Sequence, residues 1–200
     1  MRERVINVVT SLPFLVVGMH TRRARQTPEG KRFGSCLVAV GASATAYHAA
    51  SGQLRCALRK LDYWTIALAS TQMARALFPP ASARLRVLNA ASWALTPFQP
   101  TAVSTVNFGI AEVAFAREAI ADKALMRDFR KHALIGGFGL GCFMLEDLAI
   151  ARGHSFVHSL WHLHSCYAVA SANALMERRE RARLVEPSPE LSNGAQYAAA

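Results

Sequence analysis

The charged residues of this sequence gather in short clusters separated by long stretches that carry almost none. Clusters such as HTRRARQTPEGKR, REAIADKALMRDFRK and MERRERARLVE stand between apolar segments. A soluble helix would instead alternate polar and apolar faces every three or four residues. Clustered charges are typical of membrane proteins whose spans are joined by short loops. Only 18% of the residues are charged, although the mean hydropathy of +0.16 is mild.

Seven apolar segments are candidates for membrane-spanning helices. They lie at Val5–Met19, Phe33–Ala50, Leu61–Phe78, Leu85–Phe98, Ala102–Phe115, His132–Ile150 and Phe156–Leu175. The predicted fold class is all-α: a polytopic membrane protein with a seven-transmembrane helix bundle. This single domain takes up residues 1–176. The segment 177–200 is charged and then small and polar, which predicts a disordered tail.

The basic residues predict an orientation for this bundle. With seven spans, 16 Lys and Arg fall on the side of the C-terminus and six on the side of the N-terminus. Cytoplasmic loops carry the excess of Lys and Arg, so we expect a cytosolic C-terminus and an N-terminus outside or in a lumen. The membrane is an endomembrane or the plasma membrane. Basic cytosolic loops then explain the net charge of +10, and we expect no nucleic-acid partner, because basic and aromatic residues are not interleaved in the sequence.

Polar residues gather at the non-cytosolic ends of these spans. His48 ends the second span and Asp62 opens the third, while His158 and His162 open the seventh. The last two are four residues apart and so share one face of a helix. Asn7, Thr10 and Ser11 begin the first span, and Glu146 and Asp147 close the sixth. Because Lys and Arg alone gave the topology, this convergence is independent of it and predicts one site.

These residue types suit a catalytic zinc. Three neutral imidazoles from His48, His158 and His162 leave the fourth tetrahedral position to water. Zn²⁺ lowers the pKa of such a water toward 7. Asp62 is placed to take its proton and later to protonate a leaving group. A hydroxyl of Thr10 or Ser11 is placed to donate to the developing oxyanion.

Simpler interpretations remain open for each residue. Two histidines four apart on a helix often arise by chance, and His48 suits a membrane interface without any ligand. Asp62 has Arg59 and Lys60 beside it as partners for an ion pair. The histidines His20, His132, His154 and His164 are not expected to join the site.

The ordered set NVVTSLPFLVVG, AYH, LD and HSLWH resembles the CREST superfamily of seven-helix membrane proteins. That group contains alkaline ceramidases, the progestin and adipoQ receptors and enzymes that remodel GPI anchors. The resemblance implies a hydrolase-like domain with zinc on His48, His158 and His162, and with Asp62 acting on the zinc-bound water. Its substrate would be an amide or ester bond of a membrane lipid.

The sequence also departs from that family. The family serine one turn before the second-span histidine is Ala44 here, and Ser43 takes its place only if the helix turns by about 100°. Ceramidases carry an acidic calcium ligand at the position that is Arg4 in this sequence. A non-enzymatic receptor or scaffold of the same fold is therefore the alternative to a zinc hydrolase. A transporter ranks third, because its polar residues would lie near the membrane midplane.

Overall fold

The backbone of this chain is helical almost throughout. A computed structural model describes residues 2–78, 82–154 and 156–185, and it contains nine helices and no strand in those ranges. The helices are α1 (Arg2–Ala24), α2 (Pro28–Ala49), α3 (Gly52–Leu77), α4 (Ala83–Leu95), α5 (Pro100–Ala121), α6 (Lys123–Met144), α7 (Glu146–Ala151), α8 (Val157–Ser171) and α9 (Asn173–Val185). The predicted all-α class is confirmed.

Each predicted apolar segment lies on a helix, but the helices begin and end elsewhere. The sixth segment is interrupted, since α6 ends at Met144 and the short α7 follows after Leu145. The seventh passes from α8 into α9 near Ala172. The boundary expected at residue 177 falls inside α9, so residues 177–185 are helical. Residues 186–200 of the expected tail lie outside the described residues.

Local sequence signals explain where several helices begin. Thr27 caps α2 by accepting a hydrogen bond from Gly30 N, and Pro28 occupies the first helical turn, where its missing N–H costs nothing. Asp122 caps α6 by accepting from the amides of Ala124 and Leu125. Such caps satisfy amide groups that have no partner inside the helix.

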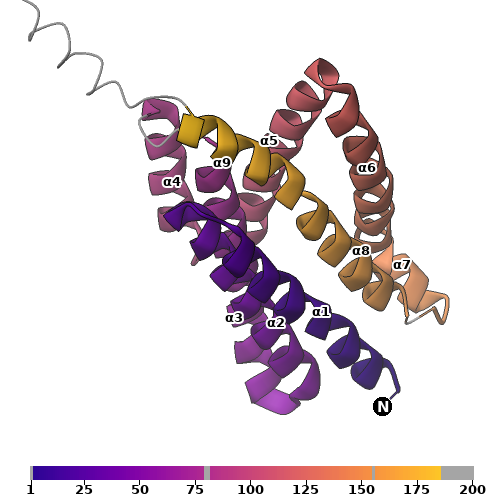
Figure 1. Cartoon of the computed structure of the whole chain (residues 1–200). Coiled ribbons are helices and arrows are strands. Elements are labelled where there is room, and N and C mark those ends of the chain that lie inside the picture. Colours follow the sequence, from indigo (N-terminus) through magenta and orange to yellow (C-terminus); the bar gives the residue numbers. More distant parts are fainter. Residues whose placement is uncertain (1, 79–81, 155, 186–200) are drawn as a thin grey trace, which may run out of the picture.

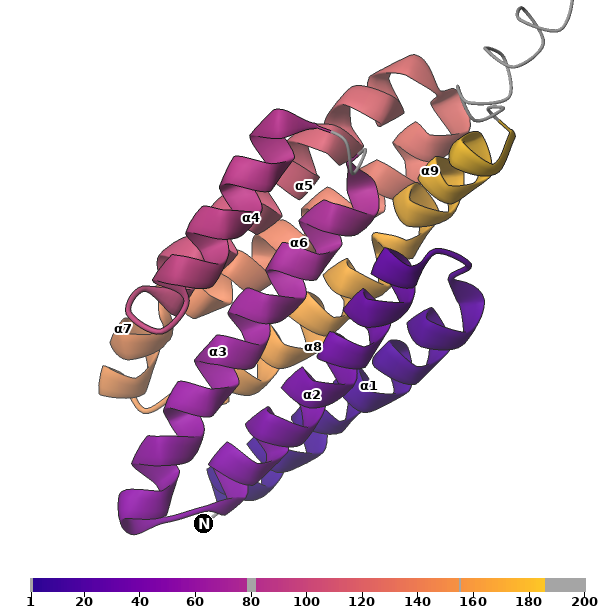
Figure 2. The same ribbon diagram turned by 90° about the vertical axis from the view of Figure 1, so that its left-hand side faces the viewer.

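The helices pack side by side in chain order, and α8 then returns to contact both α1 and α6 (Figures 1 and 2). The α1–α2 pair is the closest. A Cβ added at Gly34 would lie 2.4 Å from Arg22 N, and one at Gly41 would lie 2.8 Å from Leu15 N. Glycine lets two helix backbones approach this closely. The short α4 packs at the edge, on α3 and α5.

The bundle has many large apolar side chains on its outside and many polar ones inside. Exposed residues include Val9, Val16, Val113, Leu134 and Phe138. The interior combines an apolar core, which includes Phe33, Leu37 and Phe115, with buried polar side chains: Ser70, Thr71, Gln72, Ser92 and Asn107. Asn107 Nδ2 donates to Ser92 Oγ at 3.0 Å and so joins α5 to α4. Among the described helices, one stretch, Glu3–Ala24, is long and apolar enough to cross a membrane by length and composition. Core helices and signal sequences share that property.

Ion pairs gather the loops at one end of the bundle. Arg25, after α1, contacts Glu180 on α9 at 3.5 Å. Arg178 binds Asp122, which lies between α5 and α6, and its hydrogen bond holds the pKa of that carboxyl below its usual value. Arg183 donates to Phe78 O at the end of α3. The connections that carry most of the basic residues thus lie together around α9, and we refer to this as the basic end.

Candidate metal centre

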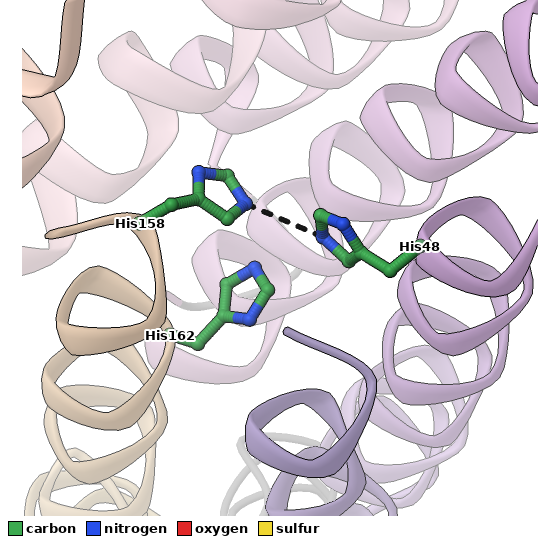
Figure 3. Close-up of side chains that lie close together, drawn as sticks. All are labelled: His48, His158 and His162. Carbon is green, nitrogen blue, oxygen red and sulfur yellow. Dashed lines mark hydrogen bonds between the residues drawn. The ribbon is translucent and has the colours of Figure 1, made fainter. Parts of the chain in front are cut away.

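Three histidines from two helices meet at the end of the bundle opposite the basic end. His48 lies on the last turn of α2, while His158 and His162 lie one turn apart at the start of α8 (Figure 3). One ligand nitrogen from each ring lies within 4.8 Å of the others. The exposed fractions are 2% for His48 and 3% for His162, and the His158 side chain is 16% exposed. This buried cluster can hold a metal ion.

The distance between two of these nitrogens fits a tetrahedral ion. His48 Nε2 and His158 Nε2 are 3.3 Å apart (Figure 3). Two nitrogens bound to zinc at about 2.0–2.1 Å from the ion would lie about 3.3–3.4 Å apart at the tetrahedral angle. A hydrogen bond between the two rings has the same length, so the distance permits both arrangements.

Hydroxyl groups on α1 decide which nitrogen of His162 is free. Thr10 Oγ1 lies 3.1 Å and Ser11 Oγ 3.4 Å from His162 Nδ1. Both hydroxyls donate their protons to α1 carbonyls: Thr10 to Ile6 O and Ser11 to Asn7 O. These contacts fit the tautomer in which Nδ1 carries the proton and donates to the hydroxyl oxygens, and this tautomer leaves the lone pair of Nε2 for a metal.

The oxyanion role expected of Thr10 or Ser11 stays a prediction. In this structure each O–H donates to a backbone carbonyl one turn earlier, and both hydroxyl oxygens lie against His162.

A carboxylate supports His158 in a similar way. Glu146 Oε1, from α7, lies 2.9 Å from His158 Nδ1, although outside the direction that a hydrogen bond from the ring N–H prefers. Ser159, the next residue along, donates to Asn7 Oδ1 at 2.5 Å and ties α8 to α1. His48 Nδ1 is buried and has no hydrogen-bond partner among the described residues.

Asp62 and Ser43 form a second group beside the histidines. Ser43 Oγ donates to Asp62 Oδ1 at 3.1 Å and lies 2.8 Å from Thr65 Oγ1. Both Asp62 and Ser43 are buried, with 6% and 5% of their surface exposed. Asp62 also interacts electrostatically with His158. Ser43 thus faces the aspartate, and Ala44 beside it is buried without a hydroxyl to offer.

The seven residues that the sequence proposed as ligands or catalytic groups lie in two groups: the three histidines with Thr10 and Ser11, and Asp62 with Ser43. His132 lies elsewhere, between Glu112 Oε1 at 2.6 Å and Ser171 Oγ at 2.7 Å. Sequence reasoning gave Glu146 no role of its own and did not single out Ser159. The HSLWH segment already contained Ser159, but the contact that gives it a role comes from a distant helix.

Comparisons with protein-family models, with curated proteins and with solved structures found no match.

Proposed function

We propose that this protein is an integral membrane hydrolase that cleaves an amide or ester bond in a lipid, with a zinc ion held by His48, His158 and His162. The buried histidine cluster carries the proposal. Three neutral nitrogen donors leave one coordination position for water or substrate, as catalytic rather than structural zinc sites do.

The distribution of side chains supports a membrane location. Large apolar residues cover the outside, and the polar side chains that lie inside beside the apolar core are largely hydrogen-bonded, which suits a lipid environment. The basic end collects the loops that carry most of the arginines, which is consistent with a cytosolic C-terminus. The metal centre then belongs on the outer or lumenal side.

The histidine partners support a metal over a simple hydrogen-bonded cluster. His162 and His158 each have an oxygen group at Nδ1, which leaves Nε2 free to face the other rings. Outer partners of this kind fix the tautomer and orientation of metal ligands. The ordered motifs also resemble the CREST superfamily, which includes zinc-dependent ceramidases.

A zinc ion at this position would activate a water molecule and polarise the carbonyl group of a lipid. The chain itself supplies the proton transfer. Asp62, held by the Ser43 hydroxyl, accepts a proton at one carboxylate oxygen and returns it to the leaving amine or alcohol. Glu146 and the α1 hydroxyls keep the imidazoles in place while this occurs.

Elemental analysis of the detergent-purified full chain, followed by hydrolysis assays with ceramides and with ester lipids, tests the proposal. We expect about one zinc per chain, lost together with activity in His158→Ala/His162→Ala. The control His20→Ala/His154→Ala removes two exposed histidines outside the cluster, and we expect it to retain both the zinc and the activity. Absence of zinc in the wild type would refute the metal centre. Bound zinc without hydrolysis of any lipid would favour the receptor or scaffold alternative.

A further inference from the structure

We propose that a cavity at the basic end, far from the histidines, binds a phosphate group. The cavity has a volume of about 220 Å³ and is bordered by residues of α2, α3 and α4, three helices whose arrangement is shown in Figure 2. It is lined by Glu29, Arg75, Leu85, Arg86 and Asn89. Pockets for drug-sized ligands usually span about 300–1,000 Å³, so this one suits a small charged group.

The charge of Arg75 is the first reason. Its side chain is half-buried in α3, and its guanidinium has no ion pair or hydrogen bond with any other residue that the structure describes. Arg86 adds a second guanidinium from α4. Glu29 is the only acidic lining residue among those that the structure describes, and it already lies 3.7 Å from Arg32. The charge of Arg75 therefore has no carboxylate partner of its own in the described part of the cavity.

Asn89 is the second reason. Its Oδ1 atom is buried and has no hydrogen-bond partner among the described residues. A buried acceptor without a donor costs free energy, and a phosphate oxygen that still carries its proton is a donor that would remove that cost. The amide nitrogen of the same side chain is a further donor for an oxyanion.

A second cavity at the same end shows the contrast. It has a volume of about 230 Å³ and is lined by Arg25 and Arg181 together with Glu177 and Glu180. Both of its arginines are paired with these carboxylates. Of these two cavities, the one beside Arg75 contains a guanidinium group, that of Arg75, without an ion-pair partner among the described residues.

A phosphate group is the ligand that this lining fits best. Arginine presents a planar fork of donors that matches two phosphate oxygens, and it does so better than a lysine. Two sources supply this chemistry: a phospholipid headgroup at the membrane surface, or free phosphate in the cytosol. The inference does not depend on the zinc site.

Binding measurements on the full chain in detergent test the site. Inorganic phosphate at constant ionic strength and a water-soluble short-chain phosphatidic acid are the probes, and the matching diacylglycerol without phosphate is the blank. We expect binding of at least one phosphate probe to weaken about ten-fold or more in Arg75→Gln, and less in Arg75→Lys. Arg84→Gln, an exposed arginine of α4 outside the cavity, should bind as the wild type does.

The pattern of binding identifies the source. Binding of phosphatidic acid alone indicates a lipid headgroup, and binding of inorganic phosphate alone indicates a soluble ligand. Failure of both probes, or equal losses in Arg75→Gln and Arg84→Gln, would overturn the proposal, because diffuse attraction would then explain any binding. If Arg75→Gln does not fold, Arg86→Gln and Asn89→Ala provide the same comparison from α4.

Discussion

At the scale of single residues, Glu146 is a neighbour of a candidate metal ligand, a role that the sequence did not predict. Its carboxylate lies 2.9 Å from His158 Nδ1 and is the charged group that contacts this nitrogen in the described structure. We expect Glu146→Gln to weaken zinc binding by about 10–100-fold, because such outer partners raise the basicity of a ligating imidazole. Competition with a chromophoric chelator measures the affinity.

Asp147 provides the matched control for Glu146. It is the next acidic residue on the same short helix, but its side chain is exposed. Asp147→Asn should keep the wild-type zinc affinity. Equal losses in the two variants would mean that only the net charge near the site matters, and Glu146 would then have no specific part in holding His158.

Ser43 gives a prediction that separates chemistry from metal binding. Its hydroxyl donates to Asp62 Oδ1 at 3.1 Å, and it contacts none of the three histidines through a hydrogen bond in the described structure. Ser43→Ala should lower kcat about ten-fold or more and leave the zinc content unchanged, because a hydrogen bond to a charged group is lost. Ser35→Ala, an exposed hydroxyl on the same helix, is the control. Loss of zinc in Ser43→Ala would contradict this assignment.

Which site residues the sequence predicts depends on whether their spacing is local. His158 and His162 are four apart, so any helix places them on one face. His48 and Asp62 were expected at the same end because the alternation of spans brings them there. The partners of these residues are set by tertiary contacts that no spacing encodes. Two features could not be predicted from spacing for this reason. One is the direction in which α2 points Ser43 toward Asp62, and the other is the break in the helix before Glu146.

At the scale of elements, α9 shows how a charged helix is fixed to the bundle. Glu180 is 4% exposed; it pairs with Arg25 and accepts hydrogen bonds from Gln26 N, Thr27 N and Thr27 Oγ1. We expect Glu180→Ala to lower the free energy of unfolding by about 3–5 kcal/mol, because it removes the buried partner of Arg25 and leaves this buried guanidinium only the exposed Glu177 as a carboxylate neighbour among the described residues. Thermal unfolding of the purified protein measures the loss.

Glu177 is the control for this prediction. It contacts the same Arg25 at 3.7 Å, but its side chain is 47% exposed. Exposed ion pairs contribute about 0–1 kcal/mol, so Glu177→Ala should unfold close to the wild type. Similar losses in both variants would show that α9 is held by overall charge and not by the buried pair.

The positions of most helices could be predicted from the sequence, because long apolar segments indicate helices. Each of the seven predicted segments lies largely on helix, with breaks at Leu145 in the sixth and at Ala172 in the seventh. A long apolar run satisfies its backbone groups most readily inside a helix. The sequence did not predict the helical conformation of residues 177–185. A segment rich in Arg and Glu has the composition of a disordered tail, and it is helical here where ion pairs join it to Glu118, Asp122 and Arg25.

At the scale of the whole molecule, the two ends of the bundle have opposite characters. One end collects the histidines and Asp62, and the other collects the arginine-rich loops around α9. If the bundle spans a membrane as proposed, residues at these ends face different compartments. Cys56 is exposed near the start of α3, at the histidine end, and Arg84 is exposed near the start of α4, at the basic end.

We therefore expect thiols at these two positions to react with a membrane-impermeant maleimide from opposite sides. The wild type carries its exposed thiol at Cys56, and Cys56→Ser/Arg84→Cys carries it at position 84. In sealed vesicles of one orientation, we expect one of these two proteins to be labelled before detergent is added and the other only afterwards. Cys56→Ser alone gives the background, because Cys142 and Cys166 are buried and Cys36 is half-buried. Equal labelling of both thiols in intact vesicles, or recovery of the chain in the soluble fraction, would contradict the membrane bundle. The histidine cluster would then need an explanation in water, where a lipid substrate has no special access to it.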